Sequence, residues 1–510
     1  MAEEKSQLRI GTILNYINMG LGAIVPLLYT PVMLRILGQE EYGLYKLSGT
    51  ITGYLGLLAL GIGGSIVRYL IKARTEGGHE EEERVFSLFI VLYRIIAAVL
   101  LVAGIVLTFN IDTWYGDSIA PAMMGKMRIL VCIMVCQSAL SFIMGPYSAM
   151  ITSHERFIFT QSLGIFQTIF APCLNLVALF MGYASIGLAV TTFISSLLGQ
   201  LIYCYYVRRK LNIHVHYKNL PWGMTREIYV FSLWLFLAEV TSMLYNSTDN
   251  LQIGARPELG AKAVAIYSIG CILQSMIWSF AAGITSVLAP RINKMCFEGS
   301  SNEELTDFAI KVGRLQMLII TTITSGFIAF GKPFIRFYAG AGYEPAYWIS
   351  LMMLMPVIPQ LVQNVFLNVS MARFKHKFRS IVQLFVAVLN VIGTYYILPY
   401  YGILGAAFVT CIAGVFARFL LLNWYYGHRL GMNTHRFWKS LYKITFIPIL
   451  FAVVAYPFQN LLEGHMLLML VLMAVYGISL VLLLYFFVMN EYEKDLIMSA
   501  FKPLKKIIRK

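Results

Sequence analysis

Long apolar segments fill most of the chain and are separated by short breaks that carry charged residues, proline or glycine. An α-helix needs roughly 20 apolar residues to cross a bilayer, and about fourteen segments meet that length. The predicted spans are 10–37, 43–71, 85–109, 123–150, 158–181, 184–207, 227–253, 261–292, 306–330, 345–371, 378–399, 402–426, 442–459 and 466–490. With 58% hydrophobic and 13% charged residues, the chain cannot coat a soluble globule. We therefore expect an all-α multi-pass membrane protein.

The distribution of positive charge predicts how the spans are oriented. Most of the 40 Lys and Arg residues fall in connections on the same side as the N-terminus, including "RRK" at 208–210, "RFKHK" at 373–377 and the tail "KPLKKIIRK" at 502–510. This bias places both termini in the cytoplasm. The net charge of +15 then favours contact of the tail with anionic lipid headgroups, and no nucleic acid partner is expected.

An internal repeat predicts the domain organisation. The stretch "LGQEEYGLYKLSGTITGYLGLLALGI" from Leu37 aligns without gaps on "LGAKAVAIYSIGCILQSMIWSFAAGI" from Leu259, and a shorter pair begins at Tyr183 and Tyr401. Both pairings keep the order of the helices, which is typical of secondary transporters with substrate sites between the repeats. The predicted parts are two six-helix lobes of parallel topology at 1–220 and 221–430, and two further helices with a basic tail at 431–510.

Arginines inside predicted spans are candidate functional residues. Arg94 is the single charged residue in the apolar stretch 86–104, and overlaying "VFSLFIVLYRIIAA" on "LTDFAIKVGRLQML" places it on Arg314 of the second half. A guanidinium in hydrocarbon costs several kcal/mol. Each arginine therefore either extends toward the inner surface, pairs with another helix, or faces an aqueous cavity, and the residues alone leave these alternatives open. Arg68 and Arg418 lie in the inner third of their spans, where anchoring at the interface is the favoured interpretation.

Two acidic residues lie in the predicted span 227–253. Glu239 is too deep for its short side chain to reach water, so it is either the partner of an arginine or a coupling-ion site. Asp249 is near the outer end, where a helix cap or a pair with Arg256 or Lys262 explains it.

Motifs for catalysis or for cofactor binding are absent from the sequence. The run "HEEEER" at 79–84 is expected to be an exposed acidic loop and not a zinc site. The chain shows no metal-ligand spacing, nucleophile triad or phosphate-binding glycine loop, so we expect no metal and no cofactor. An ion gradient, the membrane potential or substrate supply would then provide the energy for transport.

Several motifs resemble a known family. "PVMLRILGQEEYGLYKL" (31–47) with "YLGLLALGIGGSIVRYL" (54–70) is similar to the opening signature of the Wzx-type polysaccharide flippases, which serve O-antigen, capsule and exopolysaccharide synthesis. These flippases are a branch of the multidrug/oligosaccharidyl-lipid/polysaccharide exporter superfamily. "DNLQIGARPELGAKAVAIYSIG" (249–270) and "YYGILGAAFVT" (400–410) resemble segments of that family's second half. The resemblance runs over essentially the whole chain.

The resemblance implies a two-lobed bundle that opens alternately to each side of the bacterial cytoplasmic (inner) membrane. Its substrate would be an undecaprenyl-pyrophosphate-linked oligosaccharide, whose diphosphate needs cations that stay charged and bind in a bidentate manner. The implied cavity cations are Arg94, Arg314, Arg68 and Arg291, and the acids to test for ion coupling are Glu239 and Asp249. Implied partners are the polyprenyl-linked glycan and membrane lipids, with a polysaccharide polymerase and a chain-length regulator as candidate protein partners.

One part of the pattern departs from that of the related lipid II flippases, whose cavity arginines lie on the first, second and eighth spans. Here the first span has no arginine before Arg35, so Arg68 and Arg291 are the remaining loose counterparts.

Two other functions compete with this interpretation. A cation-coupled drug antiporter of the same superfamily usually has an acidic residue in its first helix, and none occurs between Glu4 and Glu40. A membrane polysaccharide polymerase or ligase usually brings a sizeable outer loop, whereas the outer connections, such as "NIDTWYGDSIAPA" and "KPFIRFYAGAGYEPA", are short. The sequence therefore predicts a transporter and not an enzyme.

Overall fold

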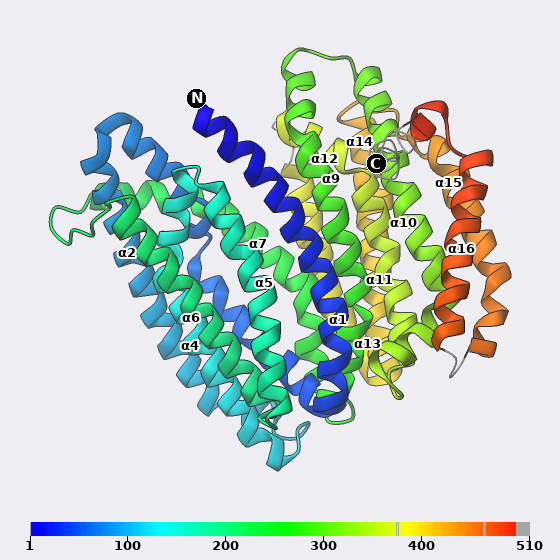
Figure 1. The fold of residues 1–510 in the computed structure, drawn as a ribbon, viewed down its shortest axis with the longest axis horizontal. Coiled ribbons are helices and arrows are strands. Elements are labelled where there is room, and N and C mark those ends of the chain that lie inside the picture. The colour runs from blue at the N-terminus through cyan, green and yellow to red at the C-terminus, as the bar shows by residue number, and fades with distance from the viewer. Residues whose placement is uncertain (1, 374, 376, 463–465, 496–510) are drawn as a thin grey trace, which may run out of the picture. The chain divides into compact units, whose positions relative to one another are not determined.

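The described part of the protein is helical throughout. The computed structural model describes residues 2–373, 375, 377–462 and 466–495 (Figure 1). The helices are α1 (Ala2–Leu55), η1 (Gly56–Ala59), η2 (Ile62–Gly64), α2 (Ile66–Phe109), α3 (Asp112–Tyr115), α4 (Pro121–Ser153), α5 (Phe157–Phe180), α6 (Ala184–Lys210), η3 (Trp222–Met224), α7 (Thr225–Gly254), α8 (Gly260–Gly270), α9 (Ile272–Phe297), α10 (Asn302–Ala339), α11 (Pro345–Val362), α12 (Asn364–Ala372), α13 (Lys377–Val415), η4 (Phe416–Leu421), α14 (Leu422–His428), α15 (Thr434–Ala455), η5 (Tyr456–Leu462) and α16 (Met466–Phe487). Among the described residues, 12 segments are long and apolar enough to cross a membrane. The predicted all-α multi-pass class is confirmed.

Three of these segments are interrupted by a glycine with non-helical backbone angles. Gly38 in α1 has φ 74° and ψ 173°, Gly78 in α2 has φ 70° and ψ −159°, and Gly402 in α13 has φ 57° and ψ −148°. Glycine adopts positive φ without a steric penalty, so the chain changes direction at these points. Each of the three long segments therefore consists of two helical parts. The count of about fourteen spans and the cytoplasmic placement of both termini stay predictions.

The chain forms two compact units, each with its own core. The first comprises Met1–Ser268 with Ala387–Ala406, and the second comprises Ile269–Val386 with Ala407–Lys510. The predicted lobes 1–220 and 221–430 and the C-terminal part 431–510 rest on the repeat and not on compactness, so this division stays a prediction. The units are described one at a time below.

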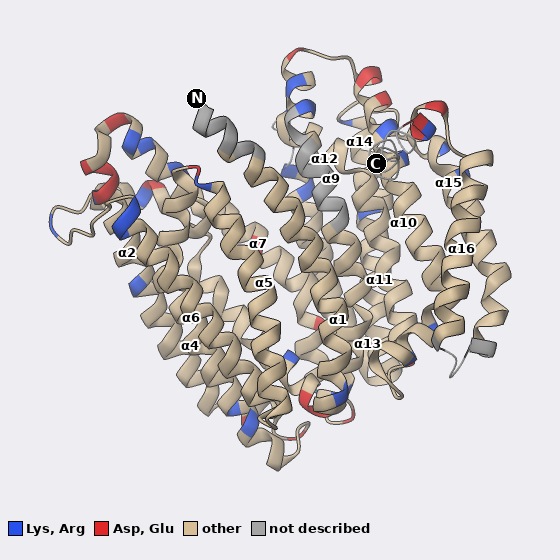
Figure 2. Cartoon of the chain, viewed as in Figure 1, with Lys and Arg blue, Asp and Glu red and all other residues tan. Residues whose placement is uncertain are grey.

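Apolar packing explains how each unit holds together. In the first unit α2 packs against α4, where Phe86 of α2 meets Tyr147 of α4 edge to face at 5.3 Å between ring centroids. In the second unit α10 packs against α15, and Phe437 of α15 contacts Phe366 of α12 at 5.0 Å. Most Lys, Arg, Asp and Glu residues lie near the ends of the helices, and the long middle stretches carry other residues (Figure 2). Helices with apolar outer faces and fully paired backbones suit a bilayer.

The helix that follows Gly38 is broken in its middle. Residues 56–65, "GLLALGIGGS", form two short 3-10 turns in which Leu60 has φ 51° and Gly61 has φ 71°. Gly61 lies directly against α7, because a Cβ added there would be 2.5 Å from the Ser232 carbonyl oxygen and 2.6 Å from the Phe236 nitrogen. Ser65 donates to the Ile62 carbonyl at 2.7 Å, which satisfies part of the interrupted backbone. Within this stretch Gly61, Ile62 and Ser65 are buried, whereas Leu60, Gly63 and Gly64 are exposed, so protein covers part of the irregular backbone.

The close contact at Gly61 predicts a strong effect of adding one methyl group. We expect Gly61→Ala to lower the free energy of unfolding by about 1–3 kcal/mol, because it combines positive φ with a backbone clash. Thermal unfolding in detergent measures the loss. Gly49→Ala is the control, since an added Cβ at Gly49 meets nothing within 4 Å and the residue lies in regular helix. Equal melting temperatures for the two variants would contradict the prediction.

Candidate functional site: a cationic pocket in the first unit

A pocket lies beside the broken helix, where the start of α2 faces the start of α7. Its cavity volume is about 550 Å³. The lining residues combine two arginines with aromatic side chains and one carboxylate: Arg68, Tyr69, Gly223, Arg226, Glu227, Val230, Phe231 and Trp234. All of them belong to the first unit. The fold thus brings together residues that are far apart in the chain, such as Arg68 and Arg226, which are separated by roughly 150 positions.

The pocket carries net positive charge. Arg68 and Arg226 are both exposed, and the guanidinium carbon of Arg68 lies 4.8 Å from the centre of the Phe231 ring. Glu227 accepts a hydrogen bond of 3.4 Å from the Tyr69 hydroxyl and lies 3.9 Å from the Lys72 ammonium. The two arginines remain in excess. Guanidinium groups bind phosphate oxygens in a bidentate manner, so the pocket suits a phosphorylated ligand.

Aromatic rings give the pocket an apolar side. The Trp234 side chain is 70% exposed, and it lies one helical turn from Phe231 on α7. Such a surface stacks against the apolar face of a sugar ring or against a lipid chain. The pocket can therefore hold a ligand that has both anionic and apolar parts.

Arg94, the second predicted cavity cation on α2, has a different partner. It is exposed, and its Nη1 donates a 2.6 Å hydrogen bond to the Tyr217 hydroxyl. Tyr217 belongs to the segment 211–221, which connects α6 to η3. The guanidinium carbon also lies 5.5 Å from the centre of the Tyr217 ring. No described contact joins Arg94 to the pocket around Arg68.

Arg314 is paired inside the second unit. Its Nε and Nη2 donate to the two carboxylate oxygens of Glu493 at 2.6 and 2.9 Å, and its Nη1 donates to the Ser440 carbonyl at 2.9 Å. The side chains are 14% and 1% exposed for Arg314 and Glu493. This geometry corresponds to the helix-pairing alternative that the sequence left open. Arg291, also in the second unit, is exposed with its guanidinium carbon 5.0 Å from the Phe308 ring.

The two predicted acids have different surroundings in the first unit. Glu239 is exposed on α7, within electrostatic range of Tyr93. Asp249 is 3% exposed and accepts hydrogen bonds from the hydroxyl of Tyr267 on α8 and, at 3.3 Å, from Thr394 on α13. Arg256 donates to the Tyr395 carbonyl at 3.0 Å, and Lys262 lies 3.9 Å from Glu40. Asp249 is thus a carboxylate enclosed by hydroxyl groups from two other helices, an environment that can bind or release a proton or a small cation.

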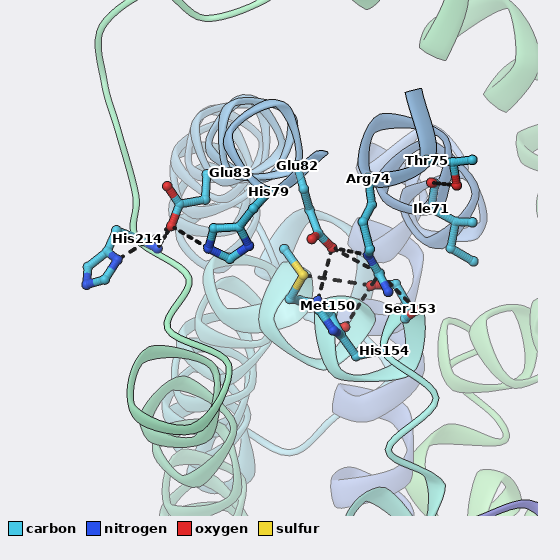
Figure 3. Close-up of polar contacts among 10 residues, drawn as sticks. All are labelled: Ile71, Arg74, Thr75, His79, Glu82, Glu83, Met150, Ser153, His154 and His214. Atoms are coloured by element: carbon cyan, nitrogen blue, oxygen red, sulfur yellow. Dashed lines mark hydrogen bonds and ion pairs between the residues drawn. The ribbon is translucent and has the colours of Figure 1, made fainter. Parts of the chain in front are cut away.

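The prediction of an exposed acidic loop at 79–84 is wrong. The chain continues there as helix α2, and Glu82 and Glu83 are buried. Glu82 accepts a hydrogen bond of 3.0 Å from Arg74, and Glu83 accepts one of 2.6 Å from the backbone of His214 (Figure 3). His214 lies far from Glu83 in the sequence, so composition alone could not reveal this contact. The described residues contain no cluster of three or more His, Cys, Asp or Glu side chains that could hold a metal ion.

Arg226 is a site residue that sequence reasoning missed. It precedes an apolar stretch and carries no feature that distinguishes it from an ordinary interfacial arginine. Its place opposite Arg68 depends on the contact between α2 and α7, which the local sequence does not encode. The repeat offered no signal either, because Arg226 lies outside both aligned pairs.

A multi-pass helical bundle with a broken helix beside an amphipathic cationic pocket has the features of a membrane transporter. The chain belongs to the Polysaccharide biosynthesis protein family, whose model matches residues 8–296. It is 24% identical over 410 residues to the Putative O-antigen transporter of Shigella flexneri, covering 77% of this chain and 91% of that protein. It is also 21% identical over 320 residues to the Uncharacterized membrane protein EpsK of Bacillus subtilis (strain 168), covering 62% of each. The family resemblance expected from the motifs is confirmed.

Solved structures share the fold. The lipid II flippase MurJ in its inward closed conformation superposes with a TM-score of 0.71 at 14% identity, covering 93% of this chain and 98% of MurJ. The MATE transporter VcmN of Vibrio cholerae gives a TM-score of 0.57 at 15% identity, covering 85% and 99%. At these identities the likeness establishes the architecture, which is that of the MurJ and MATE transporters.

Proposed function

We propose that this protein turns an undecaprenyl-pyrophosphate-linked oligosaccharide across the bacterial cytoplasmic membrane by alternating access. The observation that supports this function best is the pocket in which Arg68 and Arg226 lie beside Phe231 and Trp234. The two guanidinium groups match the two negative charges of a diphosphate, and the aromatic rings match a sugar face or the start of the lipid chain. The family and the relative named as an O-antigen transporter support the same substrate class.

The other predicted residues keep proposed roles of different kinds. Arg94 and Arg291 are exposed cations that can contact the diphosphate at another stage of transport. Arg314 was predicted for the same role, and the contacts within its unit favour a structural role first. A polysaccharide polymerase and a chain-length regulator are the proposed protein partners, because a carried repeat unit must next be polymerised. The protein itself performs no chemical step in this proposal.

Depletion of the protein tests the function directly. Lipid-linked oligosaccharide should accumulate on the inner face of the membrane, and its exposure at the outer face of sealed spheroplasts should fall. An impermeant lectin measures the exposure, and the wild-type gene supplied again is the control. Accumulation on the outer face would instead indicate a polymerase or ligase. Unchanged exposure with a new sensitivity to cationic drugs would indicate a drug antiporter.

Asp249 is the acid that the structure favours for ion coupling. Coupling transport to the movement of one charge across a potential of 100 mV changes the free energy of transport by about 2.3 kcal/mol. This corresponds to a change of roughly 50-fold in rate or accumulation. We expect Asp249→Asn to remove most of a dependence of this size on a proton or sodium gradient, measured in proteoliposomes. Asp307→Asn is the matched control, since Asp307 is an exposed partner of Arg436.

Unchanged gradient dependence in Asp249→Asn would exclude Asp249 from coupling. Glu239→Gln then becomes the informative variant, because Glu239 is the other acid predicted in α7.

A further inference from the structure

Segment 211–221, here called the strap, connects α6 to η3 and lies along α2. Its attachments to α2 occur at three levels of that helix. The backbone nitrogen of His214 donates to Glu83 at 2.6 Å, that of His216 donates to the Ser87 hydroxyl at 2.8 Å, and the Tyr217 hydroxyl accepts from Arg94 at 2.6 Å. The strap has no regular secondary structure. Besides these side chains of α2, it is held by Ile213, which is buried and whose backbone nitrogen donates to the Val207 carbonyl of α6 at 3.3 Å.

Glu83 is the centre of these attachments. Its Oε1 lies 3.4 Å from Nδ1 of His214 and 3.7 Å from Nε2 of His79, and its Oε2 lies 3.0 Å from Nε2 of His216. Figure 3 shows His79 and His214 on opposite sides of the Glu83 carboxylate. Among the described residues, the ion-pair partners of Glu83 are all histidines. The carboxylate is largely buried, whereas each of these imidazoles is more than half exposed.

Several charged groups near the strap already have partners. Glu82, on the same turn of α2, is bound by Arg74 and lies 3.1 Å from His154, which directly follows α4. Glu80 and Glu81 lie beside Arg84 on the outer side of α2. Arg208 of α6 interacts with Tyr147 of α4 and electrostatically with Tyr217 of the strap. His79, His214 and His216 are therefore the groups whose charge can change the attraction to Glu83.

These groups do not converge on a common point for a metal ion within the described part of the chain. Protonation is the change that they can undergo. A histidine side chain usually changes charge between pH 5 and 8. An imidazolium attracts a carboxylate more strongly than a neutral imidazole does, so protonation of these side chains would strengthen the attachment to Glu83.

We propose that Glu83 with His79, His214 and His216 forms a pH-sensitive latch that holds the strap on α2 more firmly under mildly acidic conditions. The strap continues into η3 and the first turn of α7, which carries Arg226 and Glu227 of the cationic pocket. Fastening the strap fixes the position of that turn. The consequence for transport rests on the proposed function, but the latch itself does not.

Hydrogen exchange of the strap tests the latch without any substrate. The amides of His214 and His216 are protected by Glu83 and Ser87, so opening of the strap determines their exchange. In the full-length protein in nanodiscs, corrected for intrinsic rates, we expect exchange to be about 3- to 10-fold faster near pH 8 than near pH 6, since each exposed pair is weak. Glu83→Gln should exchange faster at both pH values and lose most of this difference. Glu80→Gln is the matched control in the same helix, and it should behave as wild type.

A second variant separates charge from simple contact. His216→Gln keeps the backbone hydrogen bond to Ser87 and a side-chain donor, but it cannot gain a proton. It should keep the strap protected near pH 8 and show a smaller pH difference. A full pH difference in both Glu83→Gln and His216→Gln would overturn the latch. Failure of transport in a protein whose strap exchange behaves as expected would count against the proposed function alone.

Discussion

Replacing Arg68 and Arg226 together with glutamine is expected to reduce transport of the lipid-linked oligosaccharide about 100-fold or more. Each hydrogen bond to a charged group contributes about 1.5–3 kcal/mol, and the two arginines provide the excess positive charge of the pocket. Glutamine keeps much of the length of the side chain and removes the charge. Outer-face exposure of the glycan in depleted spheroplasts that carry the variant measures the loss, with protein level measured in parallel.

Controls separate this effect from a general loss of positive charge. Arg84→Gln removes an exposed arginine of α2 that pairs with Glu80, so transport should be retained. Lysine at both pocket positions should restore only part of the activity, because a lysine cannot form a bidentate contact. Full transport by the Arg68→Gln, Arg226→Gln double variant would show that the pocket does not hold the diphosphate.

Arg314→Gln is expected to act mainly on stability. It would leave Glu493 buried without its bidentate partner, which typically costs about 3–5 kcal/mol. We expect a large fall in melting temperature and in steady-state level. Arg436→Gln is the matched control in the same unit, because Arg436 and Asp307 form an exposed pair whose loss costs about 1 kcal/mol or less.

The opposite outcome is also informative. If Arg314→Gln unfolds at the wild-type temperature and yet fails to transport, the ion pair with Glu493 is not structural. Arg314 would then be a substrate cation, as the family resemblance implies.

The class of fold could be predicted because it depends on local pattern. Apolar length identifies a spanning helix, and a glycine such as Gly38 or Gly402 marks where one ends and the next begins. The broken helix at 56–65 was harder to place, because glycine is frequent in spanning helices and "GIGG" alone does not distinguish a broken helix from an intact one. Its irregular backbone depends on the contact of Gly61 with α7, a long-range feature.

The candidate pocket contains one residue named from the sequence. Arg68 was named through the family resemblance, although its depth favoured anchoring at the interface, whereas Arg226 follows from the packing of two distant helices. The repeat places Arg94 and Arg314 at equivalent positions, yet their partners differ. Tyr217 lies in a connection and Glu493 lies in a helical turn after α16, so both partners lie outside the aligned segments. Equivalent depth therefore did not predict equivalent surroundings.

Residues 66–77 form an uninterrupted helical segment, about 18 Å long at 1.5 Å per residue, with irregular backbone at each end. The irregular backbone comprises residues 56–65 before the segment and Gly78 after it. A rotation at these two points would tilt the segment, and Arg68 on it, without breaking the hydrogen bonds within the segment. Because Gly61 packs against α7, such a tilt would also shift the helix that carries Arg226. One small backbone rotation would therefore change the spacing between the two guanidinium groups of the proposed diphosphate site.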